Sequence, residues 1–283
     1  MTVHDLPLTQ WMTAIEPLVI RTGNHIRSLA RSSLTIHFKS RFDMVTEADI
    51  TAEHAIIAGL QEITPNIPVL AEEGTLSNGA GPEPDPANLC WILDPLDGTT
   101  NYAHGFPHYA ISLALFHQGR PLMGIVYDPS KTELFTAISG QGALLNNQRM
   151  AVSLTKSLEQ SLVATGFPYR VRELKQNNLA EFCAFRLHCQ GVRRFGSAAL
   201  DLAYVAAGRL DGFWERWLKP WDTAAGILLV AEAGGSVTRF DGSPFSIHDP
   251  DILASNGCIH PAMHRILSCK MPDLPDFIGM TGG

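Results

Sequence analysis

Apolar residues near the start of the chain recur at the spacing of one helical face. Between residues 8 and 32 they are separated by steps of three, four and seven, at Ile15, Val19, Ile26 and Leu29. The spacing predicts a packing helix. Pro17 predicts that this helix begins near it, because proline is favoured in the first helical turn.

A second helix is predicted to begin near Thr46. The segment Thr46-x-x-Asp49 resembles a capping box, and apolar residues follow at helical spacing until Pro65. Asp49 is therefore expected in the first turn of this helix.

Short apolar runs separated by turn residues predict strands in the middle of the chain. A short run at 67–71 precedes the Gly- and Pro-rich stretch 77–88, which we expect to be a surface loop. The strands that follow are predicted at 90–93, 109–116, 122–127 and 133–138. Their short connections favour antiparallel pairing.

Beyond about residue 148 the pattern changes to strands that alternate with helices. Strands are predicted at 162–165 and 210–214, and helices at 197–207 and 223–233. We therefore expect an N-terminal α+β half at 1–150, a C-terminal α/β half at 151–270 and a tail at 271–283.

The composition is that of an ordinary globular protein. The 283 residues are 45% hydrophobic and 17% charged, with a net charge of −7. A negative chain is poorly suited to direct binding of nucleic acid or of an anionic membrane, and the sequence has no apolar stretch of the roughly 20 residues that span a bilayer. The five cysteines form no CxxC pair, so we expect reduced thiols and a cytoplasmic location.

The segment WILDPLDGTTNY, residues 91–102, concentrates charge at the end of a predicted strand. Pro95 fixes the backbone between Asp94 and Asp97, so that both carboxylates and the Leu96 carbonyl can converge on one hard cation such as Mg²⁺. If a helix begins there, the amides of Gly98 and Thr99 suit a phosphate oxygen. An Asp-rich turn with glycine is the alternative interpretation.

Three further segments supply candidate groups. Glu72 and Glu73 follow the apolar run at 67–71, although an acidic pair followed by glycine is also common in solvated turns. Asp222 is predicted to cap the helix that follows it. Gly196 and Ser197 introduce the helix at 197–207, whose N-terminus is a second possible seat for an anion.

Taken in order, these segments resemble the inositol monophosphatase family over residues 43–256. The resemblance is carried by DMVTEAD at 43–49, the pair Glu72 and Glu73, WILDPLDGTTNYAH at 91–104, GSAALDLAYVAAGRLDGFWE at 196–215 and WDTAAGILLVAEAGG at 221–235. It implies the layered αβαβα sugar-phosphatase fold, an α/β sandwich whose sheets mix antiparallel and parallel strands. It also implies a homodimer and sensitivity to lithium.

The resemblance implies a role for each candidate residue in a magnesium-dependent hydrolysis of inositol-1-phosphate. Two or three Mg²⁺ ions would be held by Glu72, Asp94, Leu96, Asp97 and Asp222. The attacking water would be activated by Asp49 and Thr99. The substrate, a small phosphorylated metabolite, would be contacted by Gly98, Thr99, Gly196, Ser197, Ala198 and Glu215. Phosphate ester hydrolysis requires little beyond an in-line nucleophile and neutralisation of charge, which such a site can supply.

Two alternatives to this function remain open. The first is a sister activity on histidinol phosphate, fructose 1,6-bisphosphate, a 3′-phosphoadenosine nucleotide or NADP, because the same metal core serves each of them. The second is a regulatory partnership with RNA or transcription machinery, as some bacterial relatives resemble this chain and have regulatory partners.

Overall fold

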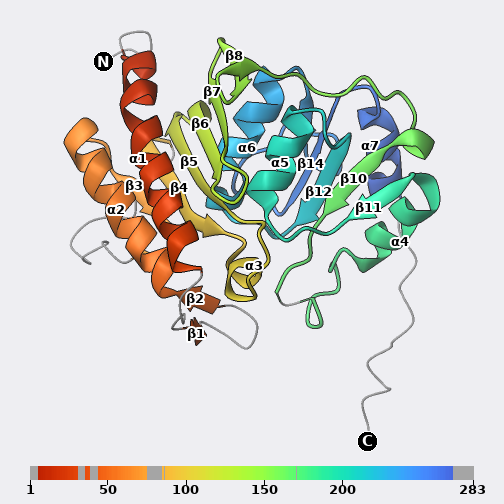
Figure 1. Cartoon of the computed structure of the whole chain (residues 1–283). Helices are drawn as coiled ribbons and strands as arrows, with labels where there is room; N and C mark the ends of the chain where they lie inside the picture. Colours follow the sequence, from red (N-terminus) through yellow and green to blue (C-terminus); the bar gives the residue numbers. More distant parts are fainter. Residues whose placement is uncertain are drawn as a thin grey trace, which may run out of the picture.

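The computed structural model describes residues 6–30, 36–38, 44–74, 85, 87–169 and 171–269. The predicted tail at 271–283 and most of the predicted loop at 77–88 lie outside the described residues. Figure 1 shows five layers: the helix pair α1 and α2, a large sheet, the pair α5 and α6, a second sheet, and the pair α4 and α7. The expected αβαβα sandwich is confirmed. The division at residue 150 stays a prediction.

The first helix starts earlier than its proline predicts. α1 spans Leu8–Leu29 with Pro17 in its interior, so the predicted start near Pro17 is wrong. An internal proline removes a helical hydrogen bond and costs about 3 kcal/mol. Met12 and Ile15 are buried in the core formed with α2, and burying such side chains stabilises the helix by about 1.5–3 kcal/mol each. Packing therefore outweighs the local penalty.

The second helix has the predicted start. α2 spans Glu47–Ile63, and its capping box joins Thr46 to Asp49. The Thr46 amide donates to Asp49 Oδ2 at 2.8 Å, while Thr46 Oγ1 accepts from the Ala48 amide at 3.2 Å. Asp49 is thereby fixed in the first turn, with its carboxylate inside the molecule.

The large sheet contains the predicted antiparallel strands. Its order is β3, β4, β5, β6, β7, β8, β9, and only β3 and β4 pair in parallel. The strands are β3 Val69–Ala71, β4 Cys90–Asp97, β5 Ala110–His117, β6 Arg120–Asp128, β7 Glu133–Ile138, β8 Gly142–Leu145 and β9 Gln148–Arg149. β4 continues four residues beyond the predicted end at 93, which carries both aspartates to the sheet edge.

The second sheet has the order β11, β10, β12, β14, β13 and mixes parallel with antiparallel pairs. Its strands are β10 Leu162–Thr165, β11 Gly191–Arg193, β12 Gly212–Arg216, β13 Ser236–Thr238 and β14 Asp251–Ser255. The strand predicted at 210–214 lies two residues further on, as β12. A separate small pair joins β1 Ile36–Phe38 to β2 Met44–Thr46, and a short 3-10 helix spans Leu158–Gln160.

Helices α5 and α6 pack between the two sheets and begin at the candidate site. α5 spans Ala198–Ala206 and α6 spans Pro220–Glu232, close to the predicted ranges. Alanines and leucines of both helices are buried in one apolar core with β5, β7, β12 and β14. The remaining helices are α3 Thr99–Ala103, α4 Leu179–His188 and α7 His260–Ser268. Within the described residues, no helix is both long and apolar enough to cross a bilayer.

Candidate active site

One cavity of about 960 Å³ gathers the candidate residues from four separate parts of the chain. It lies where β4 ends, where α5 and α6 begin, and where the chain leaves β12. The candidates that line it are Glu72, Asp94, Leu96, Asp97, Gly98, Thr99, Gly196, Ser197, Ala198, Glu215 and Asp222. Asp49 lies behind this lining and reaches the cavity through Thr99.

The two aspartates of β4 face the cavity across an irregularity in the strand. Asp94 pairs with Ser112 and Asp97 with Ala110, and the register shifts between them. The bulge lets two residues three positions apart share one site, where regular alternation would direct them to opposite faces. Asp94 is 1% exposed, and burial together with repulsion by Glu72, Asp97 and Asp222 raises its pKa well above the usual range.

Asp97 also connects the first sheet to α5. Its Oδ2 accepts a hydrogen bond from Ser197 Oγ at 2.7 Å and another from the Ala199 amide at 2.7 Å. Burial still raises the pKa of Asp97 to about 6, against the lowering effect of these two bonds. The Ser197 hydroxyl therefore makes two hydrogen bonds. It donates to Asp97, and it caps α5 by accepting from the Leu200 amide at 3.4 Å.

Asp222 is not the helix cap that the sequence predicted. The cap of α6 is Lys219, Pro220 opens the helix, and Asp222 is the third helical residue. Its Oδ2 accepts from the Lys219 amide at 2.6 Å, which satisfies the backbone at the helix start from inside the first turn. Burial and repulsion by Asp97 and Glu72 raise the pKa of Asp222 well above its usual range.

The oxygen atoms on this wall suit a hard divalent cation. The donor set consists of the carboxylates of Glu72, Asp94, Asp97 and Asp222 and the carbonyl of Leu96, and oxygen ligands of this kind are those that Mg²⁺ prefers. A cation would offset the repulsion that, together with burial, raises the pKa values of Asp94 and Asp222. In the described part of the chain, no three Asp, Glu, His or Cys side chains already stand at ligand spacing.

Asp49 and Thr99 form a buried hydrogen-bonded pair at the edge of the cavity. Thr99 Oγ1 lies 2.9 Å from Asp49 Oδ1 and 3.0 Å from the Leu96 carbonyl oxygen, and its single proton can serve one of them at a time. Donation to Asp49 leaves the Thr99 oxygen free to accept a hydrogen bond from a water in the cavity. Burial raises the pKa of Asp49, while its bonds to Thr46 and Thr99 act in the opposite direction.

The two predicted phosphate-binding turns lie side by side although about 100 residues separate them. Gly98 has φ +98°, and a Cβ there would lie 3.0 Å from the His108 carbonyl oxygen and 3.3 Å from that of Gly196. Gly196 has φ +85°. Both positions therefore favour glycine, because a side chain would be strained at either positive φ and at Gly98 would press on the Gly196 carbonyl oxygen.

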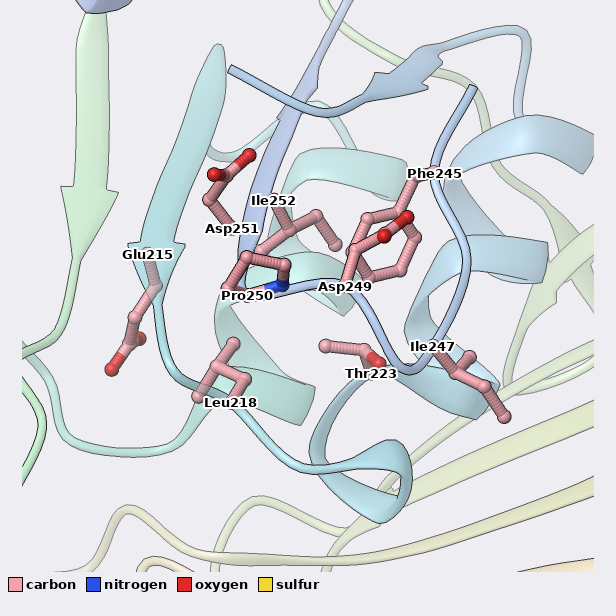
Figure 2. A pocket seen from close by; sticks show the side chains of 9 residues that line it. All are labelled: Glu215, Leu218, Thr223, Phe245, Ile247, Asp249, Pro250, Asp251 and Ile252. Carbon is pink, nitrogen blue, oxygen red and sulfur yellow. The ribbon is translucent and has the colours of Figure 1, made fainter. Parts of the chain in front are cut away.

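Glu215 lies at the end of β12 with its carboxylate against the backbone of Gly166. A Cβ on Gly166 would lie 2.3 Å from both carboxylate oxygens. Figure 2 shows this carboxylate directed away from that of Asp251 on the neighbouring strand. Burial, with repulsion by Asp97, raises the pKa of Glu215 to about 8, while Arg194 acts to lower it. Figure 2 also shows a second, small pocket beside Glu215, between Leu218, Thr223 and Ile252. Its side chains leave no room for a water molecule.

Several residues that line the cavity were not predicted as site residues from the sequence. Asn101 donates from Nδ2 to the carbonyl oxygens of His108 at 2.8 Å and Phe195 at 2.7 Å, and so joins the two glycine turns. Asp201 is 1% exposed, and no described group bonds its Oδ1. Both belong to motif segments, but only the fold shows what they face. Arg194 and Trp217 also line the cavity.

Comparison with known proteins agrees with this geometry. A model of the inositol monophosphatase family matches residues 8–272. The chain is 46% identical over 263 residues to an inositol-1-monophosphatase of Synechocystis sp., covering 92% of this chain and 90% of the relative. It is 44% identical over 252 residues to the Nus factor SuhB of Pseudomonas aeruginosa, covering 88% and 91%. An inositol monophosphatase structure from Anabaena has a TM-score of 0.83 at 40% identity, covering 95% and 99%.

More distant solved structures show which ligands such folds hold. An IMPase/NADP phosphatase complexed with NADP and Ca²⁺ has a TM-score of 0.81 at 28% identity, covering 94% of this chain and 98% of that one. A staphylococcal inositol monophosphatase soaked in LiCl, described as an inhibitory complex, has a TM-score of 0.80 at 26% identity, covering 94% and 97%. The fold is that of a layered α/β phosphatase. The chain belongs to the inositol monophosphatase family, whose members depend on metals.

Proposed function

We propose that the protein is a magnesium-dependent phosphomonoesterase that hydrolyses inositol-1-phosphate to inositol and phosphate. The observation that carries this proposal is the single cavity lined by four carboxylates, two glycine turns and Glu215. Each group is of the type that the reaction needs, and they reach the cavity from segments that are far apart in sequence. Relatives named inositol-1-monophosphatase at 46% and 42% identity support this substrate.

Two or three Mg²⁺ ions would supply charge neutralisation and a lowered pKa for bound water. The first would be held by Glu72, Asp94 and Leu96, and a second by Asp94, Asp97 and Asp222. The chain's own residues do the rest. The Asp49–Thr99 pair would orient the attacking water and receive its proton, because Thr99 can pass its own proton to Asp49.

The remaining residues would hold the substrate. The turns at Gly98–Thr99 and at 196–198 line the cavity, and their backbone amides would bind the phosphate oxygens. Hydroxyls of the inositol ring would be bound by Glu215, which Gly166 allows close to the backbone. A neutral Glu215 could both donate and accept hydrogen bonds, which suits hydroxyl groups.

A sister substrate is the alternative within the same chemistry. The cavity volume of about 960 Å³ exceeds what inositol-1-phosphate alone requires. The relative complexed with NADP shows that this fold accepts a larger phosphate ester in that protein. Histidinol phosphate, fructose 1,6-bisphosphate and 3′-phosphoadenosine nucleotides belong in the same comparison.

A regulatory partnership with RNA or transcription machinery is the second candidate function. Relatives named Nus factor SuhB are 44% identical in P. aeruginosa and 42% identical in Vibrio cholerae, which favours this role. All four carboxylates that we propose as metal ligands line the cavity of this chain. A catalytic role and a regulatory role can therefore coexist in one protein. A variant Asp94→Asn that keeps a cellular regulatory role would separate the two.

Three further properties belong to the proposal. Lithium should inhibit the enzyme, as the LiCl complex of the staphylococcal relative suggests. The five cysteines are all free thiols, which supports a reducing, cytoplasmic location. A homodimer is expected from the family resemblance.

Phosphate release from a substrate panel tests the proposal. The panel contains inositol-1-phosphate, histidinol phosphate, fructose 1,6-bisphosphate, 3′-phosphoadenosine 5′-phosphate and NADP, each with and without Mg²⁺. We expect the highest kcat/KM for inositol-1-phosphate, and inhibition by lithium. A higher value for an adenine-bearing compound would favour the sister activity. Release from none of them by folded protein would contradict the proposed enzyme activity.

A further inference from the structure

Trp217 has a backbone conformation that an aromatic residue rarely adopts. Its φ is +66°, in the left-handed region that favours glycine. Among the described residues other than glycine, five more have positive φ, and Trp217 is the only aromatic one in that group. Such a conformation persists only where the surrounding structure holds it, and residues of this kind gather at active sites and ligand-binding sites.

The surroundings hold the indole in place without burying it. Nε1 donates to the Gln176 carbonyl oxygen at 2.8 Å, and the backbone amide donates to the Pro250 carbonyl oxygen at 2.7 Å. The side chain nevertheless remains 41% exposed. A tryptophan retained for core packing would be covered, whereas this one is held through its Nε1 atom and stays partly exposed.

Trp217 is one of the residues that line the cavity. Six large hydrophobic side chains are exposed in the described part of the chain, and the two that line the cavity are Trp217 and Tyr169. Trp217 follows Glu215 by two residues, so the aromatic ring and the proposed hydroxyl-binding carboxylate stand on the same short segment. Aromatic side chains offer a flat surface on which rings stack, with little loss of conformational freedom.

We propose that Trp217 is a specificity-determining platform on which the ring of a cyclic phosphate ester stacks. The inference rests on the proposed function and adds to it a selection for cyclic over open-chain alcohols. The indole lies at the cavity wall, and the hydrogen bond from Nε1 to the Gln176 carbonyl oxygen fixes its orientation there. An acyclic polyol phosphate can use the carboxylates and the glycine turns equally well, but it presents no ring face to the tryptophan.

Kinetics of three variants on two substrates test this inference. The measured quantity is ring selectivity, defined as kcat/KM for inositol-1-phosphate divided by kcat/KM for glycerol 2-phosphate, at saturating Mg²⁺. Trp217→Gly should lower ring selectivity about tenfold, equivalent to about 1.4 kcal/mol. Trp217→Phe keeps an aromatic face and should stay within about threefold of the wild type. Gln118→Gly relieves a similar positive φ of 52° far from the cavity and should leave ring selectivity unchanged.

Thermal unfolding of Trp217→Gly separates a binding role from a packing role. Glycine relieves the backbone strain but loses the Nε1 hydrogen bond to Gln176, so the Tm should stay close to that of the wild type. A ring selectivity within twofold of the wild type in Trp217→Gly would overturn the inference, whatever the Tm. No phosphate release from either substrate by the wild type would contradict the proposed function itself, and this inference with it.

Discussion

Replacing Asn101 with alanine is expected to damage the active site more than it damages the fold. Nδ2 of this residue donates to the carbonyl oxygens of His108 and Phe195, at 2.8 and 2.7 Å. The first carbonyl precedes β5 and the second precedes Gly196. Asn101 is therefore the side chain that joins the turn at Gly98 to the turn at Gly196.

The expected loss of stability follows from the two hydrogen bonds. Each neutral hydrogen bond contributes about 1 kcal/mol net, so Asn101→Ala should lower the free energy of unfolding by about 2 kcal/mol. For a chain of this length, that corresponds to a fall in Tm of about 4 °C. The enzyme would still be folded at 25 °C, so a large loss of activity cannot come from unfolding.

The expected loss of activity is larger, because misplacing a bound group by about 1 Å can slow a reaction about a hundredfold. We expect kcat/KM for inositol-1-phosphate to fall tenfold to a hundredfold at 25 °C. Asn146→Gly is the matched control, since Asn146 also makes two hydrogen bonds to backbone groups, at Thr132 and Leu134. It lies in the turn between β8 and β9 and does not line the cavity. The control should lose stability and keep its activity. Asn101→Ala with kcat/KM within twofold of the wild type would refute the reasoning.

Three other changes probe the same site. Gly166→Ala places a Cβ 2.3 Å from both Glu215 carboxylate oxygens, so the Glu215 side chain must move. We expect kcat/KM for inositol-1-phosphate to fall at least tenfold. Unchanged kinetics would mean that Glu215 does not bind substrate. Thr99→Val should lower kcat about a hundredfold, whereas Thr99→Ser should keep most of it, and equal kcat values would exclude a role for the hydroxyl. In metal-free protein, the Glu215 pKa is about 8 instead of 4.5, so its contribution to stability is complete below pH 4.5 and is lost as pH rises to 8. Urea unfolding in EDTA should therefore show wild type losing stability relative to Glu215→Gln by about 1.4 kcal/mol per pH unit across this window, and parallel curves would contradict the shift.

Local chemistry was enough to predict the elements that carry the site. The capping box of Thr46 and Asp49 placed α2 correctly, and the glycine and serine at 196–197 marked the start of α5. Where local and tertiary terms compete, the prediction was wrong. Pro17 indicates a helix start on its own, but the buried face of α1 extends across it. Asp222 resembles a cap, yet Pro220 opens the helix two residues earlier.

Contacts between distant segments could not be predicted from spacing. Gly98 and Gly196 each indicate a tight turn, but nothing in either segment shows that the turns touch. The same limit explains why Asn101 and Asp201 were not singled out, because an amide or a carboxylate in a helix is ordinary until its partners are known. The positive φ of Trp217 is invisible in the sequence, since tryptophan does not predict it.

Phosphate release as a function of Mg²⁺ concentration, for wild type beside Asp94→Asn, tests the central claim most directly. Asp94 is 1% exposed and lies among the other three carboxylates, and asparagine keeps its shape while removing its charge. We expect saturable, magnesium-dependent release from inositol-1-phosphate by the wild type, and a loss of at least a hundredfold in a folded Asp94→Asn. Activity without Mg²⁺, or an unchanged magnesium titration in the variant, would contradict the assignment of this cavity as a metal-dependent phosphatase site.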